Sequence, residues 1–200
     1  MAIEMRNVLI LASIFLFTSC RSESLPISDT TKAEQLKKYY QLSIETNDLD
    51  IKRKFFNYFP STFSEFNSLY GFDSKSSKPQ PLYNEALDHI RGLLCQLDEN
   101  EIRGYYDKLI GLTYGAEWDA DAVNYLQDCI QKRFKENTNS FTTVLTTKSK
   151  EQVRQFFAFY FSGPPDDPIK EIPIEIERLK SRYPKIYSIA LNVFNKISKE

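Results

Sequence analysis

Residues 82–97 read LYNEALDHIRGLLCQL and carry the clearest helical pattern in the chain. Apolar side chains recur in this stretch every three or four positions, which places them along one face of a helix. These positions are Leu82, Ala86, Ile90, Leu93, Leu94 and Leu97. We therefore predict a helix over 82–97 that buries a single apolar stripe.

The same period continues through residues 31–200, with helix starts and stops marked by particular residues. Capping-box patterns begin at Thr31, Thr62 and Ser149, where two side chains satisfy exposed backbone N–H groups. Pro60 and Gly71 are typical helix stops. We expect helices over 31–44, 47–59, 62–70, 82–97, 98–111, 118–134, 149–161, 173–183 and 184–197.

Residues 137–147 are ambiguous because FTTVLTT, at 141–147, is rich in β-branched side chains. A strand there would have no partner, so we interpret the segment as a short helix. The prediction is an all-α fold: a single compact domain of about nine short helices over residues 31–200. No convincing strand is expected.

The composition excludes one large class of function. The 200 residues include 26 Lys and Arg against 27 Asp and Glu, which gives a net charge of −1. A nucleic-acid-binding protein needs a basic surplus to neutralise phosphates, so we expect no nucleic-acid partner. Only 6 residues are glycine, which disfavours a β-sandwich or barrel with many tight turns.

The N-terminal segment has the pattern of a secretory signal. Residues 8–17, VLILASIFLF, are uncharged, too few to span a membrane and of the length of a signal-peptide apolar region. Small residues follow at Thr18 and Ser19. A start at Met5 instead of Met1 would give a more positive leader, because Arg6 would then precede the apolar run without Glu4.

Residues Phe17, Thr18, Ser19 and Cys20 resemble the lipobox of bacterial lipoproteins, although Phe17 stands where that family usually has Leu. The resemblance implies a signal peptide over 1–19, cleavage before Cys20, and lipidation of Cys20. It also implies a membrane-anchored protein of the cell envelope, on the periplasmic side of a membrane or at the cell surface. Residues 20–30 would then be the lipidated Cys and a flexible tether. The alternatives are an ordinary secretory signal and a cytoplasmic protein with a buried N-terminal helix.

Two further cysteines lie on helical patterns. Cys95 and Cys129 stand beside apolar residues, as buried free thiols do. A disulfide is the alternative outside the cytoplasm, and sequence alone does not decide whether the two sulfurs meet.

No catalytic pattern is visible in the sequence. His89 is the only histidine, and it reads as a half-buried helix residue with no Ser or Cys motif aimed at it. We expect no catalytic residue, no metal site and no cofactor, and therefore not an enzyme. The acids Glu117, Asp119 and Asp121 are interpreted as a helix N-terminus. The pair at 166–167 is interpreted as a solvated turn.

The aromatic residues of 55–59 are the densest feature of the chain. Most are expected in the core, because aromatic rings bury the most surface per residue. A second hypothesis is that some of them anchor an interface with another protein. The candidates are Phe55, Phe56, Tyr58, Phe59 and Trp118.

The segments FFNYFPSTFSEFNSLYG (55–71), AEWDADAVNYLQ (116–127) and FYFSGPP (159–165) resemble small helical lipoproteins of Bacteroidetes. Those proteins have no established activity, and some are regarded as immunity proteins that bind toxins. The expected function is thus a lipid-anchored module that binds another protein. The alternatives are a structural or envelope-maintenance lipoprotein and, third, an enzyme.

Overall fold

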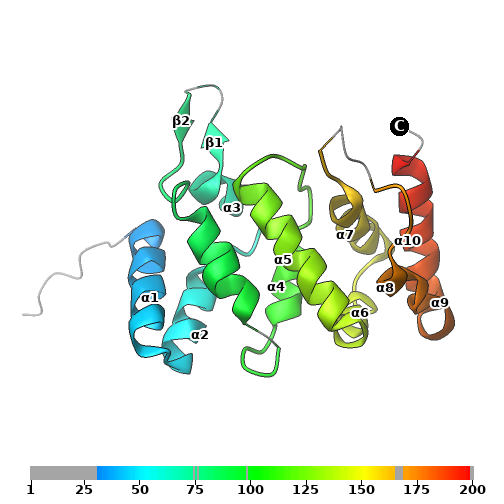
Figure 1. The fold of residues 1–200 in the computed structure, drawn as a ribbon, viewed down its shortest axis with the longest axis horizontal. Coiled ribbons are helices and arrows are strands. Elements are labelled where there is room, and N and C mark those ends of the chain that lie inside the picture. The colour runs from blue at the N-terminus through cyan, green and yellow to red at the C-terminus, as the bar shows by residue number, and fades with distance from the viewer. Residues whose placement is uncertain (1–30, 74, 76, 98, 165–168, 199–200) are drawn as a thin grey trace, which may run out of the picture. The chain divides into compact units, whose positions relative to one another are not determined.

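Helices account for nearly all of the regular structure in the computed structural model, which describes residues 31–73, 75, 77–97, 99–164 and 169–198. The α-helices are α1 (Lys32–Thr46), α2 (Leu49–Tyr58), α3 (Phe63–Tyr70), α4 (Tyr105–Gly111), α5 (Ala122–Glu136), α6 (Thr138–Leu145), α7 (Lys150–Phe161), α8 (Ile174–Glu177), α9 (Leu179–Arg182) and α10 (Pro184–Ile197). The described helices run in a row from α1 to α10 (Figure 1). The all-α prediction is confirmed, and these helices belong to one compact unit that starts at Thr31.

Polar caps begin two helices as predicted. The Glu34 amide donates to the Thr31 hydroxyl, and the Glu34 carboxylate accepts from the Thr31 amide at 2.8 Å. Ser149 and Gln152 form the same box at the start of α7. These reciprocal bonds satisfy backbone donors that the first turn of a helix leaves free.

The third predicted box is only half formed. The Thr62 hydroxyl accepts from the Glu65 amide, which caps α3 as expected. The Glu65 carboxylate instead accepts from the Ser61 amide at 3.0 Å and pairs with Lys32. This ion pair joins the start of α1 to α3.

Within the segment 82–97, residues 82–85 form turns and residues 86–96 are helical but do not form a regular α-helix, which corrects both the start and the type of the predicted helix. A π-helix spans Asp88–Leu93 and a 3-10 helix spans Leu94–Gln96. The wide π turn, in which the Leu94 amide bonds to the His89 carbonyl, turns His89 inward as well as Ile90. All six residues of the predicted apolar stripe are buried.

Several elements differ from the sequence-based expectation, including the predicted helix over 173–183, which is divided into α8 and α9. Helix α4 starts at Tyr105, because Gly104 adopts φ +80° and the Glu99 carboxylate caps the Gly104 amide at 2.8 Å. Helix α5 starts at Ala122, so Trp118 lies in the preceding connection. Residues expected as a loop after Gly71 include two short antiparallel strands, β1 (Phe72–Asp73) and β2 (Lys78–Pro79). Helix α6 confirms the helical interpretation of the 137–147 segment.

Aromatic rings fill much of the core and connect its two halves. One group surrounds His89 and the other surrounds Phe134. Tyr105 and Tyr106 connect the Phe134 group to Phe56, the chain neighbour of Phe55, through successive ring contacts with centroids 4.8 to 5.9 Å apart. Tilted and edge-on contacts of this kind are favourable beyond the area that they bury.

Candidate functional site: a basic groove beside α7 and α10

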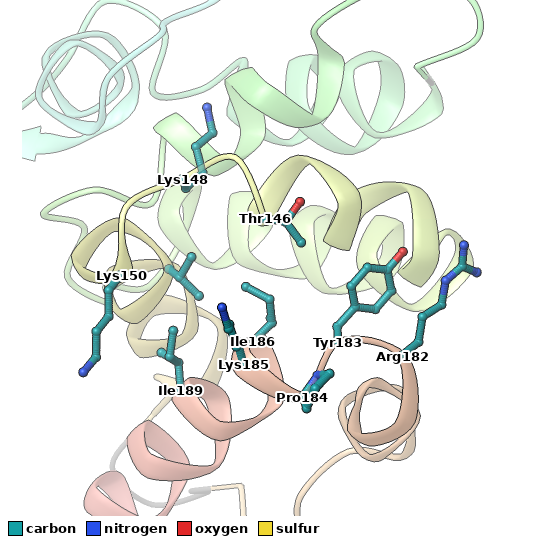
Figure 2. A pocket seen from close by; sticks show the side chains of 10 residues that line it. Thr146, Lys148, Lys150, Arg182, Tyr183, Pro184, Lys185, Ile186 and Ile189 are labelled. Carbon is teal, nitrogen blue, oxygen red and sulfur yellow. The ribbon is translucent and has the colours of Figure 1, made fainter.

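A groove of about 440 Å³ lies where the α6–α7 connection, the first turn of α7 and the start of α10 meet. We call it the α7/α10 groove. Figure 2 shows its lining side chains, which are Thr146, Lys148, Lys150, Val153, Arg182, Tyr183, Pro184, Lys185, Ile186 and Ile189. Two further pockets follow α10 past Ser188 and Asn192.

Two helices begin at this groove. The Ser149 box starts α7, and Pro184 is the first residue of α10, where its fixed φ and missing N–H fit a helical first turn. The N-terminal end of a helix carries a partial positive charge. Both helix starts therefore add to the positive potential of the groove.

The charged side chains of the groove are all basic. Lys150, Arg182 and Lys185 are exposed and make no ion pair within the described residues. Lys148 is paired with Asp107, outside the groove. No described carboxylate lines the groove, so its basic charge is only partly balanced.

The floor of the groove is apolar. Val153 and Ile186 are buried, while Ile189 is half-buried and open to the groove. The Tyr183 ring forms one wall, and its hydroxyl lies 3.1 Å from the Thr143 hydroxyl and 3.3 Å from the Asn139 carbonyl. These bonds connect the ring to α6, so one side of the groove is aromatic.

Three of the five residues proposed as an interface from sequence are in the core, which corrects that hypothesis for them. Phe55 and Phe59 are 0% exposed and Phe56 is 4% exposed. The Phe59 ring packs on Phe55 and Tyr70, with centroids 5.7 and 5.6 Å away. Helix α2 hides these rings because α1, α3 and α4 cover different sides of it.

The other two interface candidates reach the surface. Tyr58 is 39% exposed and packs against Tyr39 with centroids 5.4 Å apart. Trp118 is half-buried, and its indole Nε1 has no hydrogen-bond partner among the described residues. Tyr58 lies at the end of α2 and Trp118 in the connection before α5, so the two side chains come from different parts of the fold.

His89 is more buried than its sequence indicated. It is 1% exposed, and burial lowers the pKa of its imidazole to about 4. Tyr40, Phe55 and Tyr70 surround the ring. Such a ring is neutral at pH 7 and lies in the core.

The remaining polar candidates take structural positions. Asp121 precedes α5 without capping it, and its carboxylate accepts from the Tyr83 hydroxyl instead. Asp119 accepts from the Ala120 amide. In the described ranges, no group of three or more His, Cys, Asp or Glu side chains forms a possible metal site. The pair at 166–167 and the lipobox at 17–20 lie outside the described residues.

The groove could not be predicted from the sequence because its walls are far apart in the chain. Residues 146–153 and 182–189 meet only after α10 packs on α7. The available signal was the basic run RLKSRYPK at 178–185, next to the helix start at Pro184. A charge run of this kind is compatible with an ordinary solvated surface, so it does not predict a groove by itself.

No protein-family model, curated protein or solved structure matches the chain at a significant level. In the part of the chain that the structure describes, no helix combines the length and the apolar character that crossing a membrane requires.

Proposed function

We propose that this chain is a lipid-anchored protein of the cell envelope that binds another protein through the α7/α10 groove. The partner presents an acidic segment that carries one aliphatic or aromatic side chain. The lipid anchor rests on the likeness of residues 17–20 to a lipobox. The binding role rests on the groove.

Charge complementarity is the observation that carries the proposal. Lys150, Arg182 and Lys185 surround an apolar floor, with no carboxylate among the described lining residues. Acidic side chains of a partner would pair with these cations, and an apolar side chain would cover Ile189. Complementary charge increases the association rate and the specificity, while apolar burial at the centre provides affinity.

The position of the groove is compatible with an anchor that precedes Thr31. Helices α1 and α10 are at opposite ends of the described row (Figure 1). A tether attached at Thr31 joins the α1 end, so its point of attachment is not beside the groove. The groove is also separate from Tyr58, which lies on α2.

A peptide titration tests the binding role. The probe is a short fluorescein-labelled peptide of Glu and Leu with a central Trp, and its counterpart has Lys in place of Glu. We expect the full chain to bind the acidic peptide only, with affinity that falls as salt rises. The triple variant Lys150→Glu, Arg182→Glu and Lys185→Glu should bind about tenfold more weakly or worse.

A matched variant separates the groove from net charge. Lys38→Glu, Lys54→Glu and Lys78→Glu change the same number of charges at exposed positions outside the groove, and this variant should bind like the parent. Equal weakening in both triple variants would contradict the proposal. Binding to phosphatidylglycerol vesicles without binding to the acidic peptide would instead assign the groove to a membrane surface.

A further inference from the structure

Two cysteines meet in the core between segments that are distant in sequence. Cys95 belongs to the 3-10 helix Leu94–Gln96, and Cys129 lies in the middle of α5. Their exposed fractions are 4% and 1%. Both are free thiols in this structure, and the 3-10 helix that carries Cys95 packs against α5, which carries Cys129.

The two thiols have different surroundings. The hydrogen bond from Cys129 lowers the pKa of Cys95, and the positive charges of Lys132 and Arg133 lower it further. Burial raises the pKa of Cys129 well above its ordinary value. Cys95 is therefore the thiol that forms a thiolate more readily, and the thiolate is the reactive form.

We propose that Cys95 and Cys129 form an intramolecular disulfide when the protein meets a small-molecule or protein disulfide. This bond links the 82–97 segment to α5. It closes residues 95–129 into a loop that contains α4 and the connection carrying Trp118. The inference is independent of the groove, since it uses none of the groove residues.

The reaction is a two-step thiol–disulfide exchange, described here for oxidised glutathione. The Cys95 thiolate attacks one glutathione sulfur, breaks the glutathione S–S bond and releases one glutathione thiolate. That thiolate takes the Cys129 proton, and the Cys129 sulfur then attacks the Cys95 sulfur and releases the second glutathione as a thiolate, which takes up from water the proton that Cys95 lost on ionising. The two protein thiols are oxidised, and one glutathione disulfide is reduced to two thiols.

Burial determines when the exchange takes place. A small disulfide cannot reach either sulfur while the core is closed, because both side chains are almost fully covered. Oxidation therefore occurs during folding or local opening, where either thiol can attack first and the product is the same disulfide. Once formed, the bond restricts the unfolded chain, which raises the unfolding temperature.

The test is refolding of the full chain with Cys20→Ser, so that only two cysteines remain, from urea into glutathione redox buffer. After unfolding and alkylation without reductant, we expect a peptide pair joined through Cys95 and Cys129, two hydrogen atoms lighter than the separate peptides. The oxidised protein should unfold about 5 °C or more above the reduced protein.

The single variants Cys95→Ser and Cys129→Ser provide the controls. Neither should show an internal cross-link or a higher unfolding temperature after oxidation. The mass measurement on the two-cysteine protein does not depend on whether these variants fold. Two alkylated thiols after oxidation, or glutathione retained on Cys95, would overturn the proposal. A failure of peptide binding at the groove would leave this result unchanged.

Discussion

The hydroxyl oxygen of Tyr70 lies 2.9 Å from Nδ1 of His89, with both side chains enclosed in the core. The Tyr40 and Phe55 rings cover the imidazole, with centroids 4.8 and 5.4 Å from it. Burial lowers the pKa of His89 to about 4. The negative charges of Glu85 and Asp88 raise the pKa of His89, but by less than burial lowers it.

The low pKa of the buried His89 predicts that the protein loses stability in acid. Between about pH 6.5 and pH 4, His89 is protonated in the unfolded chain but neutral in the folded protein. The unfolded state then binds more protons, so the free energy of unfolding falls as pH decreases through this window, by roughly 3 kcal/mol in total. Urea unfolding at several pH values measures it.

A variant separates His89 from the other groups that titrate in acid. His89→Gln should be less stable than the parent at pH 7, and its stability should fall less between about pH 6.5 and pH 4. Carboxylates elsewhere contribute equally to both proteins. Parallel pH profiles for parent and variant would show that His89 does not titrate in this window.

Lys108 caps the C-terminal end of α2, and we expect this cap to stabilise the protein. Its ammonium donates to the Phe59 carbonyl at 2.8 Å and to the Phe56 carbonyl, and it lies 4.3 Å from the Phe56 ring centroid. Lys108→Met removes both bonds and leaves the carbonyls without this partner. We expect a loss of about 1.5–3 kcal/mol in urea unfolding.

An exposed lysine gives the comparison for Lys108. Lys38→Met on α1 makes the same chemical change where the side chain is open to solvent. It should change stability by less than about 0.5 kcal/mol. If the two variants are equally stable, the carbonyl bonds of Lys108 contribute nothing measurable.

Phe59 and Tyr58 are neighbours with opposite environments. Phe59→Ala should cost about 3–5 kcal/mol, because it leaves a cavity among packed rings. Tyr58→Ala should cost about 1 kcal/mol, because the ring is 39% exposed and loses mainly its contact with Tyr39. Thermal and urea unfolding of the pair checks this. A near-neutral Phe59→Ala would return that ring to the list of interface candidates.

Local signals were enough to predict much of the fold. Thr31 and Ser149 predicted helix starts because a capping box involves only residues three apart. The stripe in 82–97 predicted burial because the helical period is also local. The π turn at His89 could not be predicted in this way, since it brings His89 to Tyr70 on another helix.

The candidate site depends on tertiary packing and was therefore beyond the sequence. Lys150 and Lys185 line one groove only because α7 and α10 lie together. The aromatic run at 55–59 indicated either core or interface. Phe55 and Phe59 are in the core because other helices pack around α2 and cover both rings. The approach of the Cys95 and Cys129 segments likewise depends on the packing of α5 on the 82–97 segment.

Membrane attachment through Cys20 is the last prediction, and it tests the anchor without reference to the groove. Lipid chains on a cysteine transfer from water to the bilayer with about 0.8 kcal/mol per CH₂ group, so more than one chain holds a protein firmly. Cys20→Ser removes the only thiol in the lipobox-like residues 17–20 to which a lipid could be attached. Cell fractionation should then find the protein outside the membrane pellet, and mass spectrometry should find no acylated N-terminus.

Ser19→Ala is the control. It retains a small residue before the cysteine, and the protein should stay in the pellet. If Cys20→Ser fractionates with membranes like the parent, the lipid anchor is wrong.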